Sequence, residues 1–152
     1  MVPVTRQYVY THDARLWRLP TGGMEPEDAD PAAAARRELR EQTALTAGCW
    51  RSLGTVHGAD SATDHRDHAF LATDLTAGTP EPGPGEADLE VEWLPFARVL
   101  DLVTDGQLAH AASAFAVLTV ALRDPRWSAR RAGTGVAWAP FPVPSPAVDG
   151  KD

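Results

Sequence analysis

Three oxygen-bearing side chains, those of Glu38, Glu41 and Gln42, stand close together in the middle of a predicted helix. Glu38 comes three residues before Glu41 and four before Gln42, so at about 3.6 residues per turn all three lie on one helix face. Oxygen ligands on one rigid face suit a hard divalent cation. The alternative is a solvated face on which Arg37 and Glu41 form an ion pair that contributes little to stability.

The helix that carries these side chains has a clear predicted start. Asp30 can accept hydrogen bonds from the free amides of the first turn, and Pro31 lacks only an N–H that would have no partner there. Four alanines at residues 32–35 favour continuation of the helix. Upstream, Gly22 and Gly23 open an acidic loop. The sequence therefore predicts a glycine turn, an acidic loop and then the helix with the candidate ligands.

Residues 22–45 resemble the signature of Nudix hydrolases. In that family a Gly is followed by five residues, Glu, seven residues, Arg-Glu, an aliphatic, any residue, Glu-Glu, any residue, Gly and an aliphatic. The positions that match are Gly23, Arg37, Glu38, Leu39, Glu41 and Leu45. Ala29 and Gln42 stand where the signature has Glu, and Ala44 stands where it has Gly. The Nudix box of this chain is therefore degenerate.

The flanking segments resemble the ADP-ribose pyrophosphatase branch of the family. That branch has a strand ending in Arg-Gln-aromatic-Arg and then Glu-Leu-Pro-Ala-Gly-Gly, which residues 6–8 and 19–23 match. Val9 and Arg18 differ from this pattern, in place of the second Arg and the Glu. Including the C-terminal helices, the resemblance covers residues 4–122. It implies an α/β fold of the α+β type, with a mixed β-sheet sandwiched between helices and a shortened N-terminus.

The resemblance also implies roles for particular residues. Mg²⁺ or Mn²⁺ would be held by the Gly22 carbonyl, Glu38, Glu41 and Gln42, although Gln42 lacks the charge of the family's Glu. Glu41 would also be catalytic.

A second catalytic group is expected from the late loop, where Glu86 is the nearest match to the family's distal base. Asp88 is the other possibility, and an ordinary exposed loop carboxylate is the alternative to both. Arg6, Gln7 and Gly23 would bind the substrate, whereas an exposed strand edge would explain Arg6 and Gln7 equally well.

Two functions follow from these assignments. The first is a hydrolase that cleaves the pyrophosphate of a nucleoside diphosphate linked to another moiety, an ADP-ribose-like small molecule. The second is the same fold acting as a catalytically impaired nucleotide-binding or protein-interaction module, which Ala29, Gln42 and Arg18 would each permit. A third, weaker hypothesis is an enzyme of bacterial secondary metabolism that acts on another phosphorylated substrate.

Composition limits the other possibilities. A chain of 152 residues is long enough for one domain with one core, and we predict a Nudix domain over residues 1–124 and a Pro- and Gly-rich tail over 125–152. The net charge of −7 argues against general nucleic-acid binding, which needs a basic face. Cys49 is the only cysteine, so a cysteine-based metal cluster is excluded.

The cellular setting is also predicted from the sequence. No apolar run approaches the length of a membrane span and the N-terminus lacks a signal-peptide layout, so a cytoplasmic protein without a membrane partner is expected. The excess of Arg, Ala, Gly and Pro indicates a GC-rich bacterial genome. A homodimer is expected, because the shortened N-terminus would leave a sheet edge that a partner strand or the apolar patch at residues 136–141 could cover.

Hydrophobic patterning predicts the remaining elements. Strands are expected over residues 2–10, 16–19, 49–57, 68–75 and 89–94. Further helices are expected over 96–103 and 108–122. The Gly- and Pro-rich residues 76–87 are expected to form a functional surface loop.

Overall fold

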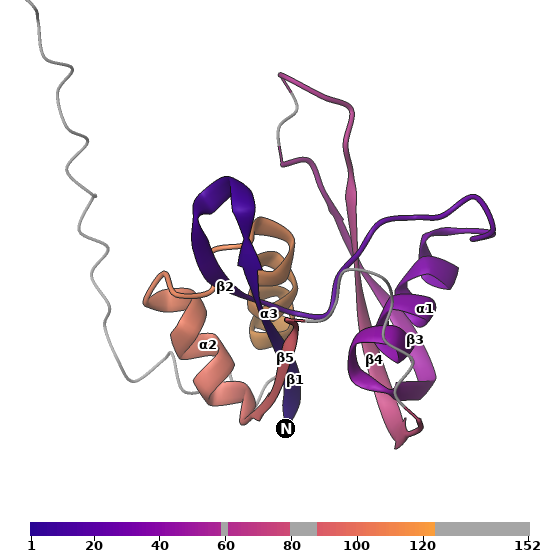
Figure 1. Cartoon of the computed structure of the whole chain (residues 1–152). Helices are drawn as coiled ribbons and strands as arrows, with labels where there is room; N and C mark the ends of the chain where they lie inside the picture. The colour runs from indigo at the N-terminus through magenta and orange to yellow at the C-terminus, as the bar shows by residue number, and fades with distance from the viewer. Residues whose placement is uncertain (59–60, 80–87, 124–152) are drawn as a thin grey trace, which may run out of the picture.

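The computed structural model describes residues 1–58, 61–79 and 88–123. In chain order its elements are β1 (Val2–Val9), the 3-10 turn η1 (Tyr10–His12), β2 (Ala14–Arg18), α1 (Pro31–Thr43), β3 (Leu45–Val56), β4 (Asp67–Ala77), β5 (Glu90–Leu94), α2 (Phe96–Thr104) and α3 (Ala111–Arg123). Figure 1 shows α1 beside β3 and β4, and α2 and α3 beside the other three strands. The predicted α+β class is confirmed.

The strands pair in two sheets. β1 is the central strand of the first sheet, whose order is β2-β1-β5, and it pairs antiparallel with β2 over residues 5–9 and with β5 over residues 2–6. β3 and β4 form the second sheet, also antiparallel. Within the described residues we therefore find two antiparallel sheets where one mixed sheet was expected. The pairing of β1 with β5 joins segments far apart in sequence, which strand patterning alone does not specify.

A bulge in β3 brings the second sheet close to α3. The register with β4 shifts between Ser52 and Gly54, and Gly54 has φ of 140°, a conformation open to glycine without a steric penalty. A Cβ at Gly54 would lie 3.0 Å from a ring atom of Phe115 on α3. Glycine at this position thus permits both the bulge and the close approach of the helix.

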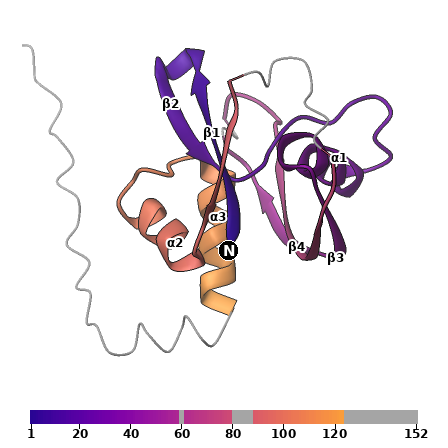
Figure 2. The same cartoon turned by 60° about the horizontal axis from the view of Figure 1, so that its bottom comes forward.

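The helices connect the two sheets. α1 packs on β3 and β4, α2 packs on β1 and α3, and α3 packs on β3 and β4. Figure 2 shows α3 between α2 and the strands β3 and β4, with α1 beside those two strands. No helix in the described ranges is both long and apolar enough to cross a bilayer. The predicted tail over residues 125–152 lies outside the described residues.

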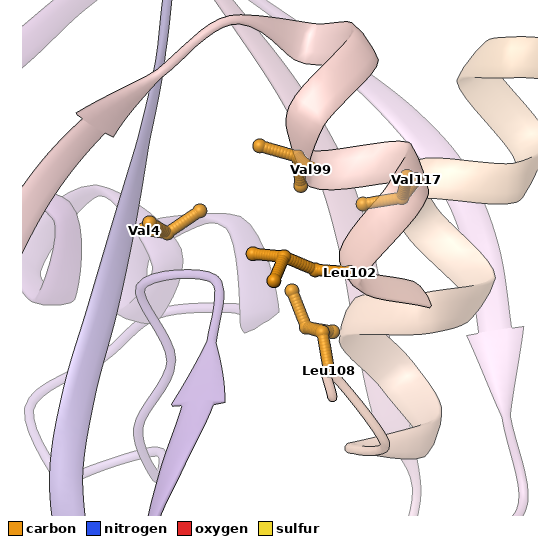
Figure 3. Close-up of a cluster of buried hydrophobic side chains, with 5 residues drawn as sticks. All are labelled: Val4, Val99, Leu102, Leu108 and Val117. Atoms are coloured by element: carbon orange, nitrogen blue, oxygen red, sulfur yellow. The ribbon is translucent and has the colours of Figure 1, made fainter. Parts of the chain in front are cut away.

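Two clusters of buried side chains form the core. The first cluster contains Val4, Val99, Leu102, Leu108 and Val117, which come from β1, α2, the α2–α3 turn and α3 (Figure 3). The second contains Leu53, Ala69 and Ala116, from β3, β4 and α3. Burial of each larger aliphatic side chain contributes about 1.5–3 kcal/mol to stability. Leu19, directly after β2, packs against both clusters.

The end of α1 explains why β3 begins earlier than predicted. Ala44 caps the helix in the left-handed conformation, with φ of 57°, and its N–H donates to the Arg40 carbonyl at 2.8 Å. The chain turns there without a loop, so the strand starts at Leu45 rather than at Cys49. Ala44 stands where the Nudix signature has Gly, the residue that adopts this conformation at least cost.

Replacing Ala44 with glycine is expected to stabilise the protein by roughly 0.5–1 kcal/mol. Relief of left-handed strain of about 1–2 kcal/mol exceeds the added entropy of the unfolded chain, which is about 0.4–1 kcal/mol. Urea unfolding measures the difference. Ala35→Gly, inside the same helix, is the control and should destabilise by roughly 0.5–1 kcal/mol. A destabilising Ala44→Gly would contradict the assigned backbone conformation.

Candidate active site

The loop from residue 19 to residue 30 carries the glycines of the site and is attached to the core at its start. The Leu19 N–H donates to Oγ of Ser113 on α3 at 3.0 Å, and Ser113 is 4% exposed. At its other end Asp30 accepts a hydrogen bond from the Ala33 N–H at 2.7 Å. That bond confirms the predicted helix start and, with Pro31 in the first turn, fixes where the loop ends.

Arg37 is the central cation of this region. One of its terminal nitrogens donates to Glu38 Oε1 and to Glu41 Oε2, each at 3.0 Å. The other terminal nitrogen donates to the Gly23 carbonyl at 2.7 Å. The guanidinium therefore brings two carboxylates of α1 and the backbone of the glycine loop together. The expected weak surface pair between Arg37 and Glu41 is instead part of a network in which the Arg37 side chain is 16% exposed.

Asp28 belongs to the same network and sequence reasoning missed it. Its Oδ2 accepts from the second terminal nitrogen of Arg37 at 3.0 Å, its Oδ1 lies 3.4 Å from Arg37 Nε, and its side chain is 7% exposed. The Glu25 N–H donates to the same Oδ2 at 2.8 Å. Asp28 stands one residue before Ala29, so a carboxylate lies next to the position where the signature has Glu. The indication of this contact in the sequence is that Asp28 is an acidic residue shortly before the helix cap.

The ionisation of Asp28 makes the stability that this network contributes depend on pH. Hydrogen bonds from Arg37, and then the Glu25 N–H, hold the pKa of Asp28 below its ordinary value, and the carboxylates around Arg37 raise the pKa of that guanidinium. A carboxyl whose pKa is lower when folded contributes stability that is complete above its unfolded pKa, about 3.9. That contribution disappears as the pH falls through the folded-state pKa.

Asp28→Asn is therefore expected to lower the free energy of unfolding at pH 7 and to have a smaller effect as the pH falls below about 4. Urea unfolding at several pH values between neutral and about 3 measures this convergence. Glu27→Gln, in the exposed neighbouring residue, is the control. A constant difference between Asp28→Asn and the unsubstituted protein at every pH would show that the charge of Asp28 does not contribute.

Gly22 lies directly against the Glu38 carboxylate. A Cβ built at Gly22 would overlap all three carboxyl atoms of Glu38, whereas one built at Gly23 meets no atom within 4 Å. The Glu38 side chain is 13% exposed, and Arg37 donates to its Oε1. Only a residue without a side chain allows Glu38 to sit on the loop backbone in this way.

Gln42 also contacts both the loop and Glu38. Its Nε2 donates to the Thr21 carbonyl at 2.7 Å and to Glu38 Oε2 at 2.9 Å. Its Oε1 accepts from the Thr21 N–H at 3.1 Å. The candidate ligand oxygen predicted from the sequence is thus engaged with the loop backbone.

The donor set fits a divalent metal of the magnesium type. Among the described residues, no three His, Cys, Asp or Glu side chains converge as in an all-protein metal cage. Mg²⁺ is usually bound by one or two carboxylates together with substrate phosphates. Glu38 and Glu41 both accept from one nitrogen of Arg37, so the structure brings together the two carboxylates that such a site would use.

The other predicted site residues lie elsewhere. Arg6 is on β1, with its guanidinium carbon 5.2 Å from the centroid of the Trp17 ring. Gln7 Nε2 donates to Asp88 Oδ1 at 3.3 Å, and Asp88 Oδ2 also accepts from the Tyr8 N–H at 3.2 Å. Glu86, the predicted distal base, lies outside the described residues. The structure gathers Gly22, Gly23, Glu38, Glu41 and Gln42 where the glycine loop meets the second half of α1, and it places Arg6 and Gln7 on the first sheet.

A cavity of about 390 Å³ adjoins the glycine loop. Gly22, Gly23 and Glu38 line it together with apolar residues of the second sheet and of α3, among them Leu53 and Val117. His110 and Ser113 also line it. Burial, and then the charge of Arg18, lower the pKa of His110 although Asp67 opposes them. The volume is in the range of small-molecule sites, and the mainly apolar wall suits a ligand with an apolar part.

Two known proteins are similar to this chain in sequence. An ADP-ribose pyrophosphatase of Mycobacterium tuberculosis is 34% identical over 120 residues, which are 78% of this chain and 58% of that protein. A CMP-5'-(N-acetyl-N-hydroxy-3-aminopropyl)phosphonate hydrolase of Streptomyces rubellomurinus is 30% identical over 113 residues, 73% of this chain and 53% of that protein. The chain thus spans between half and three fifths of the length of these relatives.

The fold has a counterpart among solved structures. The crystal structure of an ADP compounds hydrolase superposes with a TM-score of 0.68 at 22% identity, and the match covers 86% of this chain and 67% of that one. At this identity the likeness concerns the fold alone, and it confirms the Nudix fold predicted from the sequence. The model of the NUDIX domain matches residues 2–115, a range that includes the glycine loop, Arg37 and both carboxylates of α1. The chain therefore belongs to the Nudix family.

Proposed function

We propose that this protein is a hydrolase that cleaves the pyrophosphate of a nucleoside diphosphate linked to another moiety, with an ADP-ribose-like substrate. One observation carries the proposal: Arg37 brings Glu38 and Glu41 together, at 3.0 Å each, beside the glycine loop. The relative from Mycobacterium tuberculosis, an ADP-ribose pyrophosphatase at 34% identity, supports the substrate class. The bacterial origin of both named relatives supports a bacterial source.

Glu38 and Glu41 are the proposed ligands of Mg²⁺ or Mn²⁺, with the Gly22 carbonyl as a third. The chemistry that a bound divalent cation supplies is neutralisation of the diphosphate oxygens and activation of water. Arg37 keeps the two carboxylates together through its bonds to both. The Gly23 carbonyl accepts from the same guanidinium at 2.7 Å, which keeps the loop beside the carboxylates for contact with the substrate.

In the proposed reaction, water attacks one phosphorus of the diphosphate and the bridging P–O bond breaks. A nucleoside monophosphate and a second phosphate ester result, and the proton of the water passes to a base. Glu41, whose side chain is 24% exposed, and Glu86 are the proposed catalytic carboxylates. Arg6 and Gln7 are the proposed substrate-binding residues of β1. Arg6 stacks on Trp17, so its guanidinium has a fixed orientation.

Incubation with ADP-ribose and either Mg²⁺ or Mn²⁺ tests the proposal. We expect AMP and ribose 5-phosphate in equal amounts, with no products when EDTA is present. Other nucleoside diphosphate derivatives, tested in parallel, define the preferred substrate. If none is cleaved with either metal while nucleotides still bind, the hydrolase proposal is wrong. The impaired nucleotide-binding module is then the function, and Ala29, which stands where the signature has Glu, favours it.

We also propose that the protein is a homodimer. β5 is at an edge of the first sheet, and two of its apolar side chains are exposed, Val91 at 36% and Trp93 at 44%. An exposed sheet edge with apolar side chains is a surface that proteins commonly cover. Light scattering at micromolar concentration should give twice the mass of one chain, and a single-chain mass would contradict the proposal. The cytoplasmic location remains a prediction from the sequence.

A further inference from the structure

The side-chain amide of Gln42 is engaged at both of its polar atoms. Nε2 donates one hydrogen bond to the Thr21 carbonyl at 2.7 Å and another to Glu38 Oε2 at 2.9 Å. Oε1 accepts from the Thr21 N–H at 3.1 Å. Both N–H donors of the amide therefore have acceptors, and the amide pairs with the N–H and the C=O of Thr21 as a facing residue does in an antiparallel ladder.

We propose that Gln42 is a positioning residue and not a metal ligand, an inference that rests on the proposed function. Its amide fixes the glycine loop to α1 and directs the Glu38 carboxylate at the loop backbone. To bind a metal, Oε1 would have to release the Thr21 N–H at the base of the glycine loop. Releasing that bond would leave a partly buried N–H without a partner, which costs about 1–3 kcal/mol.

The position of Glu38 depends on two donors. Arg37 donates to its Oε1 at 3.0 Å and Gln42 to its Oε2 at 2.9 Å. The carboxylate sits where a Cβ of Gly22 would be, so little rotation is possible without a clash or a lost hydrogen bond. Gln42 thereby sets the direction from which the Glu38 oxygens approach the proposed metal.

A carboxylate could not replace this amide. Glutamate at residue 42 would keep the acceptor for the Thr21 N–H but would lose both donors. It would face the Thr21 carbonyl and the Glu38 carboxylate at the positions now bonded at 2.7 and 2.9 Å. Like charges at such distances repel, and two acceptors would lose their donor. Glutamine, which replaces the Glu of the Nudix signature here, therefore suits the loop backbone at Thr21 that it contacts.

The sequence makes a direct spectroscopic test practical. The chain has three glutamines, Gln7, Gln42 and Gln107, and no asparagine, so a nitrogen–proton correlation spectrum holds three side-chain amide pairs. In the metal-free, substrate-free protein we expect one pair to be well dispersed and to exchange slowly with water. It should vanish in Gln42→Met and shift in Glu38→Gln. If the Gln42 pair exchanges as fast as that of the exposed Gln107, the proposal is wrong.

Introducing a negative charge at the same position tests the role in the reaction. Gln42→Glu is expected to lower kcat for ADP-ribose by about tenfold or more, with a smaller change in KM, because Glu38 is misplaced. Its affinity for Mn²⁺ alone, measured by electron paramagnetic resonance, should not increase. Gln107→Glu, which adds the same charge at an exposed site, should leave kcat unchanged. A Gln42→Glu variant that binds Mn²⁺ more tightly and turns over at least as fast would overturn the proposal.

The two tests separate this inference from the proposed function. The spectroscopic test needs neither metal nor substrate, so its outcome does not depend on turnover. If the protein cleaves no diphosphate but the Gln42 amide is protected, the proposed function fails and the contact between Gln42 and Glu38 remains. If the protein cleaves ADP-ribose but the amide is not protected, only the positioning role fails.

Discussion

Replacing Gly22 with alanine is expected to lower kcat/KM for ADP-ribose on the order of 10²-fold, because a misplacement of about 1 Å near reacting groups can cost that much. The alanine Cβ would occupy the space of the Glu38 carboxylate. Arg37 and Gln42 both bond that carboxylate, so it can move away only by breaking bonds of 3.0 and 2.9 Å. Loss of such charge-assisted bonds should also reduce the free energy of unfolding by about 1–3 kcal/mol.

Gly23 provides the matched control. It is the next residue of the same loop, and a Cβ there would meet no atom within 4 Å. Gly23→Ala should therefore change the free energy of unfolding by no more than about 0.5 kcal/mol, because the added atoms displace nothing. Initial rates at saturating Mg²⁺ measure the activity of Gly22→Ala, and urea unfolding of both variants gives the comparison. Equal effects of the two substitutions on the free energy of unfolding would contradict the placement of Glu38 on Gly22.

Replacing Glu38 with glutamine is expected to produce the second large effect. The substitution keeps the shape of the side chain but removes the charge proposed to hold the metal. Because a bound metal contributes several kcal/mol to transition-state stabilisation, kcat/KM should fall on the order of 10²–10³-fold. Glu41→Gln should act in the same direction. Both carboxylates meet the same nitrogen of Arg37, so the two losses should not add in the double variant.

Metal dependence and a surface control make this prediction specific. In Glu38→Gln the Mg²⁺ concentration for half-maximal rate should rise, since one ligand charge is lost. Asp101→Asn, in an exposed residue of α2, removes a carboxylate charge far from the glycine loop in sequence and should keep both rate and metal dependence. A Glu38→Gln variant with normal activity would show that the carboxylate does not take part in catalysis.

Local sequence was enough to predict the start of the helix and which of its side chains share a face. Asp30 and Pro31 marked the helix start because capping depends on a few adjacent residues, and the bond from Ala33 N–H to Asp30 confirms it. The spacing of Glu38 and Glu41 placed them on one face because helix geometry is regular, and both contact Arg37.

Contacts between segments were not available to sequence reasoning. The bidentate contact of Asp28 with Arg37 spans nine residues and a loop whose path depends on several turns. The role of Gln42 depends on where Thr21 lies, which its own neighbours in sequence do not determine. Division of the strands into two sheets likewise depends on β1 meeting β5. Residue types therefore indicated which groups belong to the candidate site, but the contact partners of these groups could be identified only from the folded structure.

Leu19 gives the glycine loop a property that surface loops seldom have. Its side chain packs on both core clusters, and its N–H is bonded to the buried Ser113. Detaching the start of this loop would expose parts of both clusters at once. The free energy needed to open the start of the loop should therefore approach the free energy of global unfolding. The first residues of the loop therefore unfold with the core, and the geometry at Gly22 persists for as long as the protein stays folded.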